Sequence, residues 1–468
     1  MRRSRSTDFR SIILGCILIL TTPLIGGYDL AEMIELIDSQ NSDLSTMRLS
    51  IEESEYRTFS SRAARFPTIE GEILSTYITN PIAPVYVYPD EILAGIDWPA
   101  GMEPSSSGGP VELYGGQEPT YYQFNLSITQ PVFTWGKITD SIEISDRDVE
   151  VKWLELYIER DQLETTLEIL LDTLWYLQRI EEIVNQQLIQ VSRLVEISQQ
   201  NFDNGFILKD EVLSAEIRLH EVQLAHDSLS VDISKICNEI GNLIGIYDLS
   251  VEQIDHKPDT ARMLSREVQE YLDTSSETLI SQQRSIELID TYISISKLAE
   301  RIKKNTIYWK PDLALRFDLG YAGPRLPLIE RDWYRQDDIS LNATIAIKTT
   351  IWDGGSQLID QALSTIGVEQ AIATRSSAVN QIIHTFRQTV SQYQYAQYAI
   401  DYATKKIEVN EETISFKEQQ FKNGIGMETD LILAKLDLYV SRLELYQSYI
   451  DLSTQYHTIQ ALLFASAN

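Results

Sequence analysis

The sequence QNFDNG at residues 200–205 returns in closely similar form as EQQFKNG at residues 418–424. Phenylalanine, asparagine and glycine stay in register between the two segments at one constant offset along the chain. A second match at the same offset lies upstream, where residues 126–136 pair with residues 345–355. Because two matches share one offset, the segments between them have equal length. The sequence therefore predicts two copies of one structural unit.

The residues between the two matches follow a helical pattern. Apolar residues recur in steps of three and four from Leu163 to Val195 in the first copy and from Val379 to Ile414 in the second. No proline interrupts residues 137–201 or 356–420. Helices of this length, with apolar spacing near 3.5 residues, pack as coiled coils do, and each would be about 100 Å long. An ordinary soluble helical bundle would explain the spacing but not the length.

Each long helix is expected to end at its Asn-Gly pair and to turn back. A glycine that follows a helix commonly adopts the left-handed conformation that ends it. A helical pattern then resumes from Val212 to Ile244 and from Leu431 to Leu463. The sequence therefore predicts two helical hairpins with tips near Gly205 and Gly424.

Candidate β-strands precede each long helix. Apolar and polar residues alternate strictly over residues 124–129, 313–321 and 339–348, and less regularly over residues 69–77. Such strands have one apolar face, which needs a cover in water, whereas in a membrane it faces acyl chains and the polar face lines a lumen. Strands of about ten residues have the spanning length. Residues 78–120, which hold seven of the fourteen prolines, are expected to form a long irregular loop.

The order of these elements gives the predicted domain organisation. Each copy runs helix, strand, strand, long helix, tip and helix. Repeat 1 spans residues 28–245, residues 246–261 form the link, and repeat 2 spans residues 262–468. The first helix of each repeat is expected at about residues 29–64 and 262–308.

The N-terminus predicts export from the cytoplasm. Four arginines precede an apolar run from Ile12 to Ile25, which is shorter than the roughly 20 residues of a spanning helix. Residues 1–27 are therefore predicted to be a signal peptide, and an uncleaved anchor or a lipoprotein site at Cys16 are the alternatives. No later segment approaches 18 consecutive apolar residues, so any membrane crossing would be made by β-strands.

The composition argues against several classes of function. The chain has 39 Lys and Arg against 69 Asp and Glu, a net charge of −30, which does not suit a nucleic-acid-binding protein. Its five His and two Cys are scattered and form no ligand or nucleophile pattern, and no phosphate-binding loop is present. We therefore expect no enzyme activity, no catalytic residue, no metal and no cofactor.

These motifs together resemble those of the TolC-like outer membrane efflux protein family. The resemblance covers essentially the mature chain and rests on the strand ends at residues 130–136 and 351–355 and on the tip segments at residues 202–215 and 421–434. It implies an α+β membrane protein that forms a homotrimer. Four transmembrane β-strands from each chain would build a 12-stranded β-barrel in the outer membrane, continued by an α-helical tunnel in the periplasm. Four strands alone would leave open edges in lipid, which independently demands an oligomer, but the number three comes from the family.

The resemblance also implies a function. The protein would be a passive exit duct of a tripartite efflux pump or a type I secretion system, with a gated periplasmic entrance. Its partners would be outer membrane lipid, a periplasmic adaptor (membrane fusion) protein and, through the adaptor, an inner-membrane transporter. The alternative is a periplasmic coiled-coil scaffold or adaptor that does not span the membrane. Two hairpins that alternate with strand pairs argue against it, because adaptors usually carry a single hairpin.

Carboxylates at the tips are the first candidate site. Glu211 and Asp430 coincide at the repeat offset, and Asp210 lies beside Glu211. Acids in the first turn of a helix also complement its dipole, which would be a purely structural role. In the family an Asp that matches Asp430 lies at the constricted entrance, where a ring of carboxylates would attract cations. Two other gate positions of the family are Leu433 and Gly426 here, and they depart from the family pattern.

Two further sets of residues are candidate surfaces. The tips would dock the helical hairpin of an adaptor, as the family implies, or would only cap their own hairpins. The tip residues are Gly205, Phe206, Ile207, Gly424, Ile425 and Gly426. Three tryptophans near strand ends would form an interfacial belt or ordinary core, and these are Trp135, Trp309 and Trp352.

Overall fold

The computed structural model of the chain describes residues 27–88, 97, 99–100, 109–265, 283–306, 310–334 and 339–464. The predicted signal peptide, apart from Gly27, and the belt residue Trp309 lie outside the described residues. The chain folds into two compact units, and each takes segments from both predicted repeats. Unit 1 consists of Met1–Glu52, Glu150–Tyr292 and Ala371–Asn468, and unit 2 consists of Glu53–Val149 and Ile293–Gln370.

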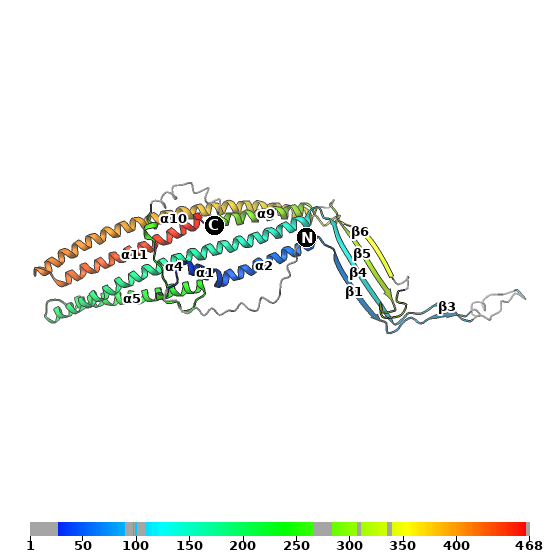
Figure 1. Cartoon of the computed structure of the whole chain (residues 1–468), viewed down its shortest axis with the longest axis horizontal. Coiled ribbons are helices and arrows are strands. Elements are labelled where there is room, and N and C mark those ends of the chain that lie inside the picture. The colour runs from blue at the N-terminus through cyan, green and yellow to red at the C-terminus, as the bar shows by residue number, and fades with distance from the viewer. Residues whose placement is uncertain are drawn as a thin grey trace, which may run out of the picture. The chain divides into compact units, whose positions relative to one another are not determined.

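Two helical hairpins dominate unit 1. Helices α4 (Lys137–Asp203) and α5 (Lys209–Ile244) form the first hairpin, and α10 (Ser356–Lys422) and α11 (Glu428–Phe464) form the second. The first residues of α4 and α10 belong to unit 2. Figure 1 shows the four helices side by side in the order α5, α4, α11, α10, so that α5 and α10 are the outer pair. The predicted hairpins are therefore confirmed, with ends within a few residues of those expected.

The core of unit 1 lies between these helices. Leu167, Leu171 and Leu174 of α4 are buried together with Leu229 and Ile233 of α5. A second cluster joins α10 to α11, and its buried members include Phe386, Tyr393, Ile400, Leu452 and Ile459. Burying one such side chain contributes about 1.5–3 kcal/mol, so the apolar seams of the sequence hold the hairpins together.

The first predicted helix is broken at Asn41. One helix over residues 29–64 was the wrong expectation, because the chain forms α1 (Leu30–Gln40) and α2 (Ser42–Ala63). The Asn41 backbone is extended, and its side-chain oxygen accepts from the backbone N–H groups of Asp43 and Leu44 at 2.9 and 3.2 Å. Its amide nitrogen donates to the carbonyl of Leu243 on α5 at 3.2 Å. Asn41 therefore caps α2 and ties the break to the core.

Shorter elements occupy the link and the start of repeat 2. The 3₁₀ turn η1 (Val251–Gln253) lies in the link, followed by α6 (Thr260–Met263) and, beyond residues that are not described, α9 (Arg284–Lys304). Among the described helices, none combines the length and the apolar character that crossing a membrane requires.

Unit 2 contains a four-stranded antiparallel sheet with the order β1-β4-β5-β6. The strands are β1 (Thr68–Tyr77), β4 (Thr120–Phe133), β5 (Asp312–Gly323) and β6 (Ile339–Lys348), which coincide with the four predicted segments. The β4–β5 ladder joins strands from the two predicted repeats. Strands β1 and β6 are the two edges, and each has one neighbour among the described strands.

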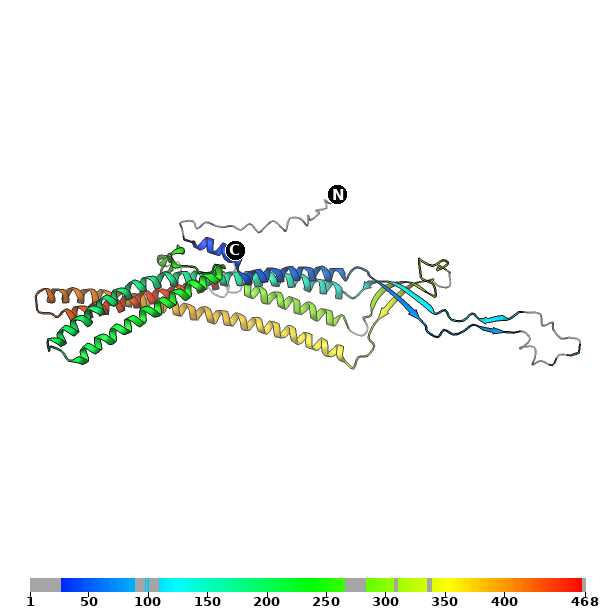
Figure 2. The ribbon, with the colours of Figure 1, turned by 90° about the horizontal axis from the view of Figure 1, so that it is seen from below.

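The loop between β1 and β4 is more regular than expected. Within residues 78–120, β2 (Val85–Val87) pairs with β3 (Val111–Tyr114) as a second, two-stranded sheet. Valine and tyrosine favour extended backbone, and antiparallel pairing satisfies backbone groups between the prolines. Figure 2 shows this ladder as the continuation of the β1–β4 pair.

Candidate functional site

The two faces of the four-stranded sheet differ in polarity. Residues paired across antiparallel strands lie on the same face, so the register defines rows that cross the whole sheet. Two apolar rows are Ile69, Ile128, Phe317 and Ala343, and Ile73, Phe124, Tyr321 and Ile339. The row between residues 69 and 73 on this face is Gly71, Leu126, Leu319 and Leu341. Two polar rows on the opposite face are Glu70, Ser127, Asp318 and Asn342, and Glu72, Asn125, Gly320 and Ser340.

Much of the apolar face is open to solvent in the single chain, whereas Tyr321, which contacts Trp333, is buried. Ile73 is 75 % exposed and Leu341 is 76 % exposed, although both belong to apolar rows. On the polar face the Asp318 carboxylate accepts hydrogen bonds from Ser127 Oγ at 2.6 Å and Arg316 Nε at 2.8 Å. An exposed apolar area of this kind marks a surface that contacts another apolar phase or another protein.

The two hairpin tips share one backbone geometry. Gly205 and Gly424 have φ of 78° and 74°, in the left-handed region that favours glycine. The Phe206 N–H donates to the Asn201 carbonyl at 2.8 Å, and the Ile425 N–H donates to the Gln420 carbonyl at 3.0 Å, which is the bond that closes a Schellman motif. The repeated Asn-Gly pair is therefore a repeated helix stop, as the sequence predicts.

Beyond the glycines the tips present apolar side chains. Phe206 is 77 % exposed and Ile425 is 76 % exposed, whereas Ile207 and Gly426 are half-buried. The side chains of Phe206 and Ile425 are thus held at equivalent, accessible positions by turns whose backbone groups are already hydrogen-bonded. This geometry fits both local capping and contact with a partner.

The candidate carboxylates differ in their surroundings. Asp210 and Glu211 lie exposed in the first turn of α5, and within the described chain neither side chain forms an ion pair. Asp430 lies in the first turn of α11, and its Oδ2 is 3.4 Å from Lys417 Nζ on α10. The sequence reasoning missed Lys417, which lies 13 residues away on the other arm of the same hairpin.

The two described belt residues also differ. Trp135 lies at the end of β4 with a positive φ of 55°, and its indole N–H donates to the Pro311 carbonyl at 2.9 Å. Trp352 is largely exposed in the turn after β6. Trp135 therefore fixes the approach of β5 to β4, while Trp352 is free to contact an interface.

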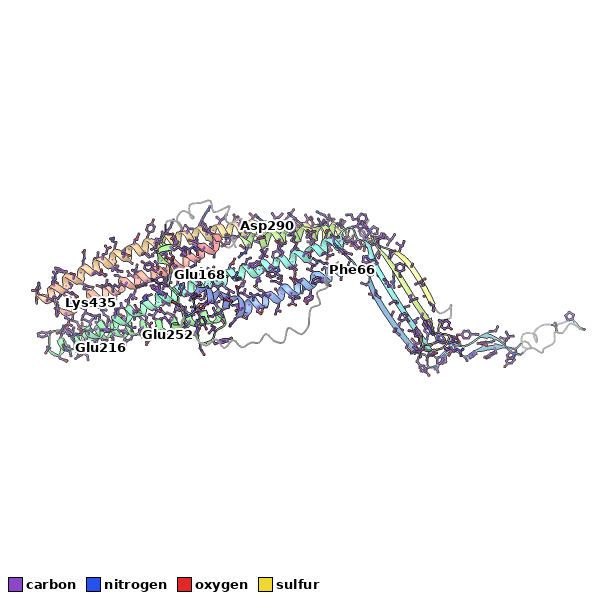
Figure 3. The ribbon with its side chains drawn as sticks, in the orientation of Figure 1. Phe66, Glu168, Glu216, Glu252, Asp290 and Lys435 are labelled. Atoms are coloured by element: carbon purple, nitrogen blue, oxygen red, sulfur yellow. The ribbon has the colours of Figure 1, made fainter. Side chains whose placement is uncertain are left out.

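A buried ionic cluster in unit 1 was not foreseen from the sequence. Asp172 on α4 is 2 % exposed, and its two carboxylate oxygens contact His256 Nε2 of the link at 2.6 Å and His457 Nε2 of α11 at 2.9 Å. Ser453 Oγ also donates to Asp172, and His457 Nδ1 lies 2.8 Å from Glu168 Oε2. Figure 3 labels Glu168 on α4. We call these five residues the Asp172 cluster.

The Asp172 cluster favours the charged forms of Asp172 and His457. Burial alone would raise the pKa of Asp172, but hydrogen bonds from His256, His457 and Ser453 outweigh it and lower that pKa to about 2. Burial would lower the pKa of His457, but its bonds to Asp172 and Glu168 raise it to about 9. The cluster is a paired structural network, and within the described residues no group of acidic, His and Cys side chains is arranged to hold a metal ion.

By sequence, no protein-family model and no curated protein matches the chain. By structure it is similar to the outer membrane protein VceC of Vibrio cholerae, with a TM-score of 0.70 and 15 % identity over 92 % of this chain and 95 % of that one. The Campylobacter jejuni CmeC outer membrane channel gives a TM-score of 0.70 and 12 % identity over 93 % and 86 %. The open state of the Neisseria gonorrhoeae MtrE outer membrane channel gives 0.66 and 12 % over 93 % and 88 %.

These similarities extend over nearly the whole chain at low sequence identity. They show that the chain has the fold of outer membrane channels, so the resemblance to the TolC-like outer membrane efflux protein family is confirmed as a likeness of fold. The motifs predicted this fold because they mark helix stops and strand ends, which set where the hairpins turn and where the strands finish.

Proposed function

We propose that this protein is a passive exit duct in the outer membrane, built as a homotrimer and serving a tripartite efflux pump or a type I secretion system. The observation that carries the proposal is the sheet of unit 2, with one apolar face, one polar face and two edges that no other described strand pairs. The likeness to outer membrane channels supports it.

The chemistry of the sheet favours a barrel made from several copies. In lipid each backbone N–H and C=O group has to be hydrogen-bonded within protein, so the free edges of β1 and β6 require partners. The β6 edge of one copy would pair with the β1 edge of the next, with the apolar rows facing lipid and the polar rows facing the lumen. Two copies would give eight strands, whose interior side chains fill, whereas three give twelve and a wider interior.

The helical hairpins would continue the duct into the periplasm. We propose that Glu211, Asp430 and Asp210 line its entrance, where carboxylates from three copies would favour cations. Trp135 and Trp352, with Trp309, would mark the interface between lipid and water.

The exposed tips would dock a periplasmic adaptor, and through it the duct would reach an inner-membrane transporter. Phe206 and Ile425 are the residues on which this docking rests, because both are exposed on turns that need no further partner. Replacing both with glutamate is expected to abolish cross-linking to the adaptor while the trimer stays intact. Cross-linking at the original level would contradict the docking role.

Cell fractionation with heat-modifiable gel mobility tests the duct itself. The expected result is recovery of the mature chain with outer membranes, release only by detergent, and a slow oligomer band that boiling converts to monomer. A periplasmic scaffold would instead be released by osmotic shock. A monomer that stays soluble without detergent would overturn the proposal.

A further inference from the structure

Four segments that link the sheet of unit 2 to its helices contain no acidic residue. They are residues 56–69 before β1, 119–139 around β4, 301–311 before β5 and 339–352 around β6. Although the chain as a whole carries a net charge of −30, the charged residues of these segments are nine Lys and Arg and no Asp or Glu. The negative charge of the chain is therefore reversed locally.

The four segments meet at one end of the sheet. Strand β1 begins at Thr68 and β4 ends at Phe133, and the register places Asp312 at the start of β5 opposite Lys348 at the end of β6. We call this the helix end, because the chain passes here into α2, α4, α9 and α10. Residues 78–120, which join β1 to β4 at the opposite end, contain six Asp and Glu and no Lys or Arg. The two ends of the sheet thus differ in charge.

Exposed aromatic side chains lie among the cations of the helix end. Phe66 is 67 % exposed where α2 passes into β1 (Figure 3), and Trp352 is 74 % exposed in the turn after β6. Phe133 is 51 % exposed, and its ring lies 5.0 Å from that of Trp135. Lys310 Nζ lies over the Trp135 ring, 5.6 Å from its centre. Aromatic and basic side chains at the end of apolar strands are typical of the region where lipid headgroups meet water.

Helix dipoles explain only part of the basic pattern. Arg301, Lys303 and Lys304 lie in the last turn of α9, where a cation is favoured. Lys310, however, lies outside any helix, and Lys137 is the first residue of α4, where the dipole disfavours a cation. The helix dipoles therefore do not account for the lack of acids in all four segments.

Some of these cations can bind an anion from outside the chain. Arg65 is exposed, and no described acidic side chain forms an ion pair with it. Lys304 bonds Glu300 of its own helix at 2.7 Å, but its side chain is 47 % exposed, and surface pairs of this kind are weak. Asp312, at the helix end of the sheet, is already bonded by Lys137 at 2.7 Å. Arg65 and Lys304 therefore remain available to an external anion.

We propose that Arg65, Lys304 and Lys310 form a basic collar that binds the phosphate headgroups of anionic phospholipids in the membrane leaflet next to the helices. The proposal rests on the proposed outer membrane duct and adds a lipid class and a leaflet to it. Lipid fits the collar because the exposed apolar rows of the sheet adjoin it and would contact the acyl chains. The acids elsewhere in the chain do not oppose this binding, because charges more than about 8 Å away are largely screened at physiological salt.

Lys348 offers a matched control on the other face of the sheet. Its partner across the ladder is Asp312, and by alternation this pair shares the polar face with Arg316 and Asp318. In the proposed duct that face lines the lumen, so Lys348 should take no part in lipid binding. It has the charge and the position along the sheet of a collar residue, but it lies on the opposite face.

Competition between two phospholipids tests the collar. The oligomer is purified in an uncharged detergent and incubated with equimolar phosphatidylglycerol and phosphatidylcholine, and native mass spectrometry counts the lipids that it retains. We expect a preference of about fivefold for phosphatidylglycerol. The preference should fall to within about twofold in the triple variant Arg65→Gln, Lys304→Gln, Lys310→Gln and should persist in Lys348→Gln.

Charge-preserving substitutions separate charge from packing. The variant Arg65→Lys, Lys304→Arg, Lys310→Arg disturbs the same contacts and should keep the preference, whereas about 0.5 M NaCl should weaken it by screening. Inorganic phosphate should not displace the lipid, because it has no acyl chains to contact the sheet. Displacement by inorganic phosphate, or loss of the preference in the charge-preserving variant, would contradict the collar.

Heat-modifiable mobility of the same samples separates the two proposals. An intact oligomer without a lipid preference, or with a preference that the triple glutamine variant retains, would overturn the collar and leave the duct standing. An equal loss in Lys348→Gln would also overturn the collar, because the effect would then not depend on the face. A wild-type chain that forms no oligomer and stays soluble without detergent would overturn both.

Discussion

Similar apolar side chains are buried in the helical core of unit 1 but exposed on the sheet of unit 2. Leu171 of α4 is 1 % exposed within a cluster that the chain completes by itself, whereas Leu341 of β6 remains largely exposed. Both belong to regular apolar patterns, one with helical spacing and one with alternation. A pattern in the sequence thus shows that a face will be covered, but not whether the cover comes from the same chain.

The difference has a physical basis in geometry. A helix can bury its apolar stripe against the next helix of a hairpin, and α4 does so against α5 and α11. A four-stranded sheet cannot fold onto itself, so its apolar rows and its two edges need partners from outside. The core should therefore respond to loss of volume, and the sheet to a change of polarity.

The strongest contrast is expected from the same truncation in the two regions. Leu171→Ala should lower the free energy of unfolding by about 2–5 kcal/mol, because it opens a cavity in a closed core. Leu341→Ala removes contacts only with the surroundings of the sheet and should change the free energy of unfolding by less than about 1 kcal/mol. Thermal unfolding followed by circular dichroism in detergent measures both, and equal losses would break the comparison.

Within the sheet, a change of polarity should have a large effect on the apolar face and little effect on the polar face. Leu341→Arg places a charge on the apolar face and should disfavour membrane insertion by about 2–4 kcal/mol if that face meets lipid near the midplane. The matched control Asn342→Arg, at the next position along the same strand, places the charge on the polar face and should insert normally. Fractionation and oligomer bands give the readout, and equal loss in both variants would contradict the assignment of faces.

The Asp172 cluster should make the helical core sensitive to pH. The pKa of His457 is raised to about 9 in the folded chain. Its contribution to the free energy of unfolding is therefore full below the unfolded pKa of about 6.5 and is lost as pH rises through 9. The pKa of Asp172 is lowered to about 2 in the folded chain. Its contribution to the free energy of unfolding is therefore full above about pH 4 and is lost as pH falls toward 2.

The melting temperature should therefore be highest near pH 4–6.5 and should decline between pH 7 and 9. His457→Gln should flatten the decline on the alkaline side because it removes the titrating ring. An unchanged slope in that variant would assign the pH dependence to other groups. His220→Gln, on the exposed side of α5, is the matched control and should leave the slope unchanged.

The smallest effect on stability is expected at the tips. Glu211→Gln with Asp430→Asn removes exposed or half-exposed charges, so the free energy of unfolding should change by no more than about 1 kcal/mol. Conductance across a planar bilayer should nevertheless show a lower preference for cations if these carboxylates line the entrance. Unchanged selectivity would remove them from the proposed entrance.

The repeat offset made the fold largely predictable. Helix stops at Gly205 and Gly424 and alternation in the strands are local signals, and the structure places hairpins and strands where these signals are. The sequence did not predict the helix break at Asn41, because a single asparagine inside a helical pattern is ambiguous until its partner on α5 is known. The sequence did not predict the β2–β3 ladder, because the many prolines around these two short strands indicated an irregular loop.

The Asp172 cluster could not be read from the sequence at all. Asp172 and His457 are 285 residues apart, and no local pattern links a buried acid on one helix with a histidine on another. The partner of Asp430 was equally hidden, because Lys417 becomes its neighbour only after the hairpin turns. Contacts that depend on packing are therefore the part that the sequence alone leaves open.

The distance along the chain between Asp172 and His457 has a consequence for biosynthesis. Their bond cannot form until the ribosome has added residue 457, long after α4 has been made. Before that point Asp172 can pair only with His256 of the link, and its two partners on α11 are still missing. The contact between the two inner helices is therefore available only to a nearly complete chain.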